Sequence, residues 1–192
     1  MDDTPERHPR EPTIFTIGHS TRSIETLVEL LHAHRIERLM DVRTVPRSGR
    51  NPQFNRETLP ETLRASGIGY AHVPALGGLR HPRPDSINTG WRNAGFRGYA
   101  DHMQTAEFEE HLHRLIDRAR HERVAIMCAE AVPWRCHRSL IADALTVRGV
   151  AVQHILGAEH AQAHHLTPFA RVDGTTITYP SIEPLDLPFD AS

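Results

Sequence analysis

The sequence predicts an α/β protein with three layers, a mostly parallel five-stranded sheet with helices on both faces. Short apolar runs rich in β-branched residues alternate along the chain with segments in which apolar residues recur at helical spacing. This alternation is typical of βαβ units, whose strands run parallel. A chain of 192 residues is also long enough to bury a full core as one domain.

Three of the five strands are predicted in the first half of the chain. They are expected over 13–17, 39–42 and 70–73. A helix should begin after Ser23, because Ser is a common N-cap residue and the following apolar residues recur at helical spacing. Pro60 favours the first turn of a second, shorter helix that ends near Gly67.

The second half predicts the remaining two strands and most of the helices. The strands are expected over 124–128 and 150–155, and the helices over 96–103, 105–119 and 136–147. Residues 75–98 form the longest irregular stretch and contain several Gly and Pro residues. A loop of this length in a compact domain is usually functional or mobile, and a lid over a ligand site is one such role.

The chain is predicted to contain one α/β domain over 13–157, a flexible N-terminal tail over 1–12 and a C-terminal extension over 158–192. The tail is charged and Pro-rich, without the apolar segment of a signal peptide. The His-rich extension should form a hairpin that turns at Asp173-Gly174. No stretch approaches the roughly 20 apolar residues of a membrane helix. We therefore expect a cytoplasmic protein with reduced cysteines and no membrane partner.

The composition excludes several classes of function. The formal net charge of −2 argues against a protein held on DNA or anionic lipid mainly by bulk charge. All 22 basic residues are arginine, which excludes a P-loop lysine, a Schiff-base lysine and a lysine general base. Compositional bias explains the missing lysine without a functional reason.

Reactive side chains follow three of the predicted strands at their carboxyl ends. In an open parallel sheet these ends lie along one edge, where ligands bind. We therefore expect one shared site, although loops are polar in any protein. The candidate residues are His19 and Ser20 after the first strand, Asp41, Arg43 and Arg47 after the second, and Cys128, Glu130, Cys136, His137 and Arg138 after the fourth.

The strongest local element is the segment CAEAVPWRCHR over 128–138. Pro133 interrupts the chain after the strand, so Cys136 is expected in or beside the first turn of the next helix. The helix dipole, the adjacent arginines and His137 would lower the pKa of this thiol and make it a nucleophile. A structural role for both cysteines stays open, and for Cys128 a small buried side chain is the favoured interpretation.

The two carboxylates and His19 each have two interpretations. Glu130 and Asp41 either form an acid–base pair or bind arginines and hold loops in place. His19 is either a general acid or a hydrogen-bond donor that braces its loop.

The arginines near the same edge also have two interpretations. A guanidinium group binds phosphate or carboxylate through two parallel hydrogen bonds, so arginines here suit an anionic ligand. The alternative is that they are solvated surface residues. The arginines concerned are Arg43, Arg47, Arg135 and Arg138.

A metal ion and a nucleic acid are the other ligands that the sequence suggests. Thiolate and imidazole ligands could come from both cysteines, His137 and His19, but the spacing of the cysteines matches no common zinc motif. Zinc is therefore not favoured and no cofactor is predicted. The long loop interleaves arginines (Arg80, Arg92, Arg97) with Trp91 and Phe96, as single-strand binding surfaces do. Aromatic anchors that fold the loop onto the sheet are the favoured alternative.

Several spaced motifs together resemble the family called domain of unknown function 488. They are Thr16-Ile-Gly-His-Ser20, Asp41-Val-Arg43 with Pro46 and Ser48, Leu76-Gly-Gly78, FRGYADHM over 96–103, Cys128-Ala-Glu130 and Cys136-His-Arg138. The resemblance covers about Thr13 to Gly157. It implies an α/β domain whose shared polar residues are those of the site above, and it brings no established reaction.

We expect an enzyme of hydrolase or transferase type that acts on a small anionic, nucleotide-like or phosphate-bearing substrate. Arg43 and Arg138 would bind the anion, with Ser20, Arg47, Cys128 and His137 as further contacts. Cys136 would be the nucleophile, or Glu130 with Asp41 would transfer protons, and His19 would assist. The alternatives are a non-catalytic nucleotide or nucleic-acid binding module and a redox switch between Cys128 and Cys136.

Overall fold

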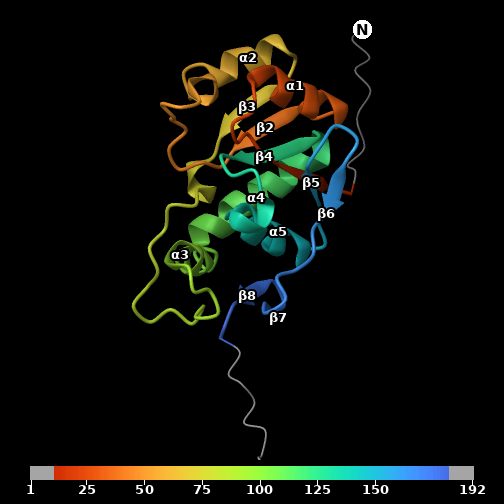
Figure 1. The fold of residues 1–192 in the computed structure, drawn as a ribbon. Helices are drawn as coiled ribbons and strands as arrows, with labels where there is room; N and C mark the ends of the chain where they lie inside the picture. The colour runs from red at the N-terminus through yellow and green to blue at the C-terminus, as the bar shows by residue number, and fades with distance from the viewer. Residues whose placement is uncertain (1–10, 182–192) are drawn as a thin grey trace, which may run out of the picture.

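The computed structural model describes residues 11–181 and confirms the α/β fold (Figure 1). The strands are β1 (Thr13–Gly18), β2 (Arg38–Asp41), β3 (Gly69–His72), β4 (Val124–Cys128), β5 (Ala151–Ile155) and β6 (Ala161–Ala163). They form one sheet in the order β3-β2-β4-β1-β5-β6. The first five strands run parallel and β6 pairs with β5 in the antiparallel direction.

The sheet therefore contains six strands rather than the five that were predicted. The additional strand, β6, has the sequence Ala-Gln-Ala and carries no β-branched residue, so it lacks the usual strand signal. It is a strand because its backbone pairs with the exposed edge of β5, with Gln153 opposite Ala163 and Ile155 opposite Ala161. Tertiary pairing, rather than local propensity, determines this element.

Two helices cover one face of the sheet: α1 (Ile24–Ala33) and α2 (Leu59–Ala65). The Ser23 side chain caps α1 by accepting a hydrogen bond from the backbone N–H of Thr26 at 3.2 Å. Leu27 and Leu31 of α1 are fully buried against the sheet residues Phe15, Ile17 and Leu39. Apolar residues at this spacing place one face of the helix on the sheet.

Three helices belong to the opposite face: α3 (Ala94–His102), α4 (Ala106–His121) and α5 (Arg138–Thr146). Short single-turn helices, η1 (Pro52–Phe54), η2 (Pro74–Leu76) and η3 (Pro133–Arg135), lie in the connecting loops. The aromatic residues of the long loop are anchors, because Trp91 stacks on Phe96 with centroids 4.8 Å apart and also contacts Phe169 and Tyr179. The three-layer arrangement thus follows the prediction.

The C-terminal extension forms the predicted hairpin from β7 (Arg171–Asp173) and β8 (Thr176–Thr178). Gly174 takes the positive φ of 58° in its turn. The predicted tail lies outside the described residues except for residues 11 and 12, and residues 182–192 of the predicted extension also lie outside them. Within the described part of the chain, none of the helices has the length and apolar character needed to cross a bilayer.

The fully buried carboxylate of Asp143 attaches the extension to α5. It accepts hydrogen bonds from His164 Nε2 (2.8 Å), from the backbone N–H and hydroxyl of Thr167 (3.0 and 2.7 Å) and from the Tyr179 hydroxyl (2.8 Å). A carboxylate with this many donors loses little of its solvation on burial.

A chain of hydrogen bonds continues from Asp143 through the sheet. A carboxylate only accepts, so His164 donates from Nε2 and its Nδ1 accepts from His154 Nε2 at 3.0 Å. His154 Nδ1 then accepts from the Thr16 hydroxyl at 2.8 Å, and the Thr16 oxygen accepts from Arg138 Nη1 at 3.2 Å. Each hydrogen bond in this chain then joins one donor to one acceptor.

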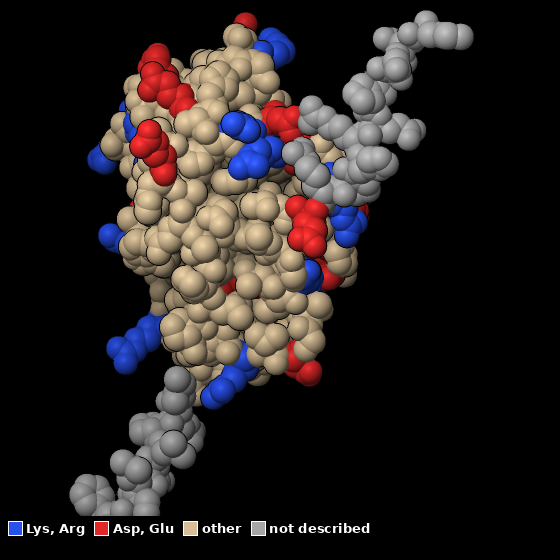
Figure 2. Space-filling model, turned by 90° about the vertical axis from the view of Figure 1, so that its right-hand side faces the viewer, with Lys and Arg blue, Asp and Glu red and all other residues tan. Residues whose placement is uncertain are grey.

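Charged side chains of both signs are interspersed on the face drawn in Figure 2, around a centre that is largely uncharged. This distribution matches the small net charge of the chain. This face therefore offers no extended surface of one sign for a polyanion.

Replacing Asp143 with Asn should destabilise the fold by roughly 2–4 kcal/mol, because one amide cannot accept from all the donors that the carboxylate satisfies. Urea denaturation followed by circular dichroism measures the free energy of unfolding. The matched control is Asp117→Asn, an exposed carboxylate on α4 that contacts only Arg120 in the described part of the chain. The control should stay within about 0.5 kcal/mol of the wild type. Equal effects in the two variants would contradict this role of Asp143.

Candidate active site

The candidate site lies at the carboxyl ends of the central strands, where the topology opens a crevice. β4 pairs with β1 on one side and with β2 on the other, all in parallel. The connection after β1 leads to β2 over the face covered by α1, and the connection after β4 leads to β5 over the opposite face, covered by α5. Connections that leave neighbouring strands in opposite directions define the switch point at which α/β sheets bind ligands.

Close contact between the ends of β1 and β4 fixes the loop that follows β4. The backbone N–H of His19 donates to the carbonyl of Cys128 at 3.0 Å. A Cβ at Gly18 would lie 1.9 Å from the carbonyl oxygen of Glu130, so only glycine lets the two loops meet. Ser20 follows with a φ of 49°, a left-handed conformation uncommon outside glycine.

Asp41 holds Arg43 in place at the end of β2. Its carboxylate, which is fully buried, accepts from Nε and Nη2 of Arg43 at 2.8 and 2.6 Å and from the Tyr70 hydroxyl at 2.9 Å. Nη2 of Arg43 also donates to the Phe54 carbonyl at 2.7 Å, and Nη1 donates to His19 Nε2 at 3.2 Å. One N–H of Nη1 has no partner among the described residues. These are the arginine contacts that the loop-holding interpretation expects, and a part for Asp41 in acid–base catalysis stays a prediction.

His19 also holds Arg43 through a ring nitrogen. Its Nδ1–H donates to the Ser20 carbonyl at 2.9 Å, so Nε2 carries the lone pair that accepts from Arg43. The ring stacks on Phe54 with centroids 4.3 Å apart. Burial lowers the pKa of His19 to about 4, and the charge of Arg43 acts in the same direction. The imidazole is therefore neutral near pH 7, with both nitrogens occupied.

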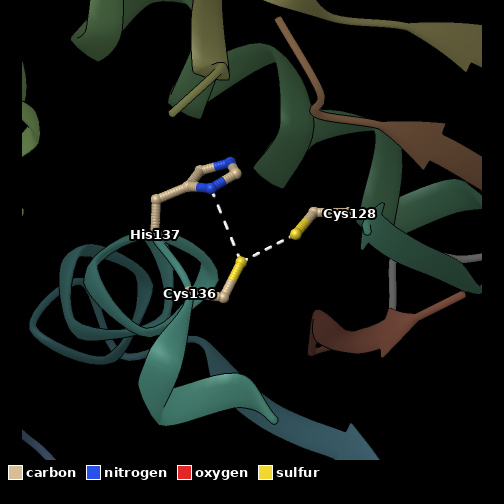
Figure 3. Close-up of side chains that lie close together, drawn as sticks. All are labelled: Cys128, Cys136 and His137. Carbon is tan, nitrogen blue, oxygen red and sulfur yellow. Dashed lines mark hydrogen bonds between the residues drawn. The ribbon is translucent and has the colours of Figure 1, made fainter. Parts of the chain in front are cut away.

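The two cysteines lie side by side at the base of the site (Figure 3). Cys128 ends β4 and Cys136 precedes α5 by two residues, and their sulfur atoms are 2.7 Å apart. Both thiols are free and buried. Burial alone would raise the pKa of Cys136, but the hydrogen bond with Cys128 and the nearby His137 and Arg138 hold it well below its ordinary value. The hydrogen bond, burial and the charge on Cys136 raise the pKa of Cys128.

The imidazole of His137 faces the sulfur of Cys136. Its Nε2 lies 3.2 Å from the Val42 carbonyl and donates to it, which leaves the Nδ1 lone pair directed at the Cys136 sulfur at 3.5 Å. A Cβ at Gly78 would lie 2.5 Å from Nδ1, so glycine is required for the loop to pack against the ring. The sulfur and the imidazole form a Cys–His pair of the kind that stabilises a thiolate.

Two cavities meet at this edge of the sheet and share Arg43, Val45, Ala129 and Glu130. The first, of about 400 Å³, is the cysteine cavity, lined also by Thr44, Gly78, Leu79, Asn93, Gly95, Phe96, Cys128, Arg135, Cys136 and His137. The second, of about 390 Å³, is the arginine cavity, lined also by His19, Ser20, Thr21, Arg47, Ser48, Arg50, Asn51 and Ala131. One ligand can therefore reach the thiol and the arginines together.

Arg138 lines neither cavity, although the sequence suggested that it binds substrate. Its guanidinium is almost completely buried and donates to the Glu130 carbonyl and to the Thr16 hydroxyl. A charged group in this position holds the loop after β4 and acts on the thiols through its field. Arg135, by contrast, is exposed and lines the cysteine cavity.

Cys128, Cys136 and His137 form the cluster that could hold a metal ion in the described part of the chain, since their ligand atoms all lie within 4.8 Å of one another. Two thiolates on one zinc ion, with Zn–S bonds of about 2.3 Å in tetrahedral geometry, keep their sulfur atoms roughly 3.8 Å apart. The sulfur atoms here are 2.7 Å apart. The two sulfur atoms would therefore have to move apart for the cluster to hold zinc.

The structure brings the predicted residues to one edge and divides them by role. The predicted residues that line the cavities are His19, Ser20, Arg43, Arg47, Cys128, Glu130, Cys136 and His137. Asp41 and Arg138 line neither cavity and hold Arg43 and the loop after β4 in place. Sequence reasoning missed the apolar wall formed by Val45, Leu79 and Phe96 and the contacts of Tyr70 and Gly78. The Gly77-Gly78 pair was the available signal, because paired glycines often mark close backbone approach.

These features define a class of protein: a parallel α/β domain with a cluster of two buried cysteines and a half-buried histidine, and with arginines, at its topological switch point. The chain belongs to the family described as Domain of unknown function DUF488, whose model matches residues 23–145. No curated protein and no solved structure matches the chain.

Acidification should destabilise the protein between pH 6.5 and pH 4. Burial lowers the pKa of both His19 and His154 from 6.5 to about 4, so the unfolded chain binds protons in this range that the folded chain does not. By linkage, the free energy of unfolding then decreases as the pH decreases, by about 3 kcal/mol for each histidine over the full range. Urea denaturation at pH 7, 5.5 and 4.5 measures the slope.

The variant His154→Gln should reduce this slope, because the substituted side chain does not titrate. His121→Gln, at the exposed end of α4, is the matched control and should leave the slope unchanged. A free energy of unfolding that stays constant across the range would contradict the buried neutral state of the two imidazoles.

Proposed function

We propose that the protein is a cytoplasmic, thiol-dependent enzyme of hydrolase or transferase type that acts on a small anionic, nucleotide-like or phosphate-bearing substrate. The observation that carries this proposal is the position of Cys136. Its sulfur lines a cavity that also contains arginines, and it contacts both a second thiol and an imidazole lone pair. A thiolate stabilised in an accessible, positively charged site is the usual basis of cysteine nucleophilicity.

Cys136 and His137 supply the nucleophile. The proton of the Cys136 thiol passes to Nδ1 of His137, whose Nε2–H stays bonded to the Val42 carbonyl. The imidazolium then lies beside the thiolate, and the S–H of Cys128 donates to the same sulfur. Two donors on the sulfur offset its burial.

The arginines supply the affinity for an anion. Arg43 is fixed by Asp41 and His19 and retains an N–H without a partner in the described part of the chain. Arg47 and Arg50 are exposed side chains at the wall of the arginine cavity. A guanidinium that is already fixed loses little entropy when it binds phosphate or carboxylate, so Arg43 is suited to orient the substrate.

Glu130 lies where the two cavities meet and is suited to transfer a proton. Attack by the Cys136 sulfur on the electrophilic atom of the substrate forms one bond and breaks the bond to the leaving group. The imidazolium of His137 gives its proton to that group. The Glu130 carboxylate then takes a proton from the water or acceptor that releases the bound group from sulfur and returns it to His137 through solvent, which restores the Cys136–His137 pair.

A non-catalytic nucleotide or nucleic-acid binding module is the second candidate, and the exposed arginines favour it. Arg92 and Arg135 make no ion pair within the described residues, and neither do Arg47 and Arg50. Arg80 does not belong to this set, since it pairs with Glu107 at 3.8 Å and also donates to the Gly77 and Ala75 carbonyls. A binding module needs no stabilised thiolate, so the state of Cys136 distinguishes the two functions.

Cys136 should react with iodoacetamide at a pH well below the ordinary thiol value of about 8.5. Peptide mass spectrometry of the native protein, labelled across a pH series, gives the rate at each cysteine. The variant Cys128→Ala should raise the apparent pKa of Cys136 by about one unit, because it removes the S–H donor. If Cys136 titrates like a free thiol while the protein binds a single-stranded oligonucleotide in a salt-dependent manner, the binding module replaces the enzyme.

The rate at which anionic iodoacetate labels Cys136, divided by the rate for neutral iodoacetamide, should report the charge of the cavities. Replacing Arg47 or Arg50 with Gln should lower this ratio by about two- to fivefold, because each removes a positive charge near the thiolate. Arg114→Gln, an exposed arginine on α4, is the matched control and should leave the ratio unchanged. An unchanged ratio in all three variants would show that these arginines do not act on a bound anion.

A further inference from the structure

We propose that the two thiols work as a pair and reduce a small anionic disulfide by two electrons, with Cys136 as the attacking thiol and Cys128 as the resolving one. The inference rests on the proposed function, because Cys136 must first act as a nucleophile. It adds a reaction class to that function, thiol–disulfide exchange, and a role for the residue that the sequence favoured as a small buried side chain.

The position of Cys128 carries the inference. Its sulfur lies 2.7 Å from that of Cys136, and both residues line the same cavity. A reacting group held at this distance has an effective concentration of about 10⁵ M or more relative to a partner in solution. Any group joined to Cys136 through a sulfur–sulfur bond would be displaced by Cys128 before a thiol from solution could reach it.

The environment of Cys128 orders the two steps. In the free protein its thiol donates to Cys136, and burial and the charge on Cys136 add to that hydrogen bond in raising the pKa of Cys128. Cys136 loses its negative charge when it forms a bond with the substrate. Cys128 then becomes easier to deprotonate, with His137 Nδ1 within 4.8 Å as the acceptor. The second thiol is activated only after the first has reacted.

The electrons balance over two exchanges. The Cys136 thiolate attacks one sulfur of the substrate disulfide, the sulfur–sulfur bond breaks, and the leaving thiolate takes the proton that His137 received from Cys136. Cys128, after giving its proton to His137, attacks the Cys136 sulfur and forms the intramolecular disulfide, and the second half of the substrate leaves as a thiol. The substrate gains two electrons and the cysteine pair loses two. A dithiol from solution restores the pair.

The cavity walls suggest the kind of disulfide. Val45 and Leu79 are 61% and 73% exposed, and with Phe96 they form an apolar wall at the mouth of the cysteine cavity. Arg43 and Arg47 lie on the side of the arginine cavity. A substrate with an apolar or aromatic part beside the disulfide and a carboxylate or phosphate further out fits both walls.

The aromatic, dicarboxylate disulfide 5,5′-dithiobis(2-nitrobenzoate) has this chemistry and serves as the probe. The full-length protein is reduced, freed of reductant, kept under nitrogen with a chelator and mixed with a slight excess of the probe. Absorbance follows release of thionitrobenzoate, and mass spectrometry of the intact protein identifies the product. The wild type should release two thionitrobenzoates per chain and end as an adduct-free protein with an internal disulfide.

The variants separate this inference from the proposed function. Cys128→Ser should release only one thionitrobenzoate and keep the other as a stable adduct on Cys136, and Cys128→Ala serves if the serine variant unfolds. Cys136→Ser should lose the fast phase by at least about tenfold, because the stabilised thiolate is removed. A wild-type protein that keeps an adduct on Cys136, or on both cysteines, would overturn the thiol pair while leaving the nucleophile intact. A native protein without any fast phase would overturn both.

Discussion

The parallel pairing of β4 with β1 and β2 is the constraint on which the rest of the structure depends. Because the connections after β1 and β4 leave over opposite faces, their carboxyl ends cannot be covered by a helix and remain open as a crevice. Gly18 lets the loop after β4 cross the end of β1 at contact distance. Backbone hydrogen bonds between the strand ends therefore hold the thiols, Glu130 and the loop after β2 close together.

Burial then separates the polar residues at this edge into two groups. One group holds the loops in place, and the other faces the cavities. A buried charge is tolerated only with a partner, and Asp41 and Arg43 satisfy each other within the sheet end. Arg138 holds the loop after β4 by donating a hydrogen bond to the Glu130 carbonyl. What these contacts leave at the cavity walls is the thiol of Cys136, the carboxylate of Glu130 and a set of arginines. The supporting network thus makes the ligand-facing groups rigid.

The thiol pair also depends on the C-terminal extension. Asp143 binds the extension to α5, and the hydrogen-bond chain from it through His154 ends at Arg138, which contacts the loop between the cysteines. The predicted C-terminal extension is therefore linked to the site through Arg138. Burial lowers the pKa of His154 in this chain of hydrogen bonds to about 4, so its imidazole is neutral near pH 7.

The sequence by itself determined the fold class, the strands other than β6 and the edge of the sheet at which the candidate residues meet. These follow from local periodicity and from the rule that parallel strands end on one side. Only the tertiary structure decided the pairing of β6, the contact between Cys128 and Cys136, and the supporting roles of Asp41, His19 and Arg138. The physical reason is that burial, hydrogen-bond partners and pKa values depend on neighbours distant in the chain, such as Thr16 for Arg138 and Tyr70 for Asp41.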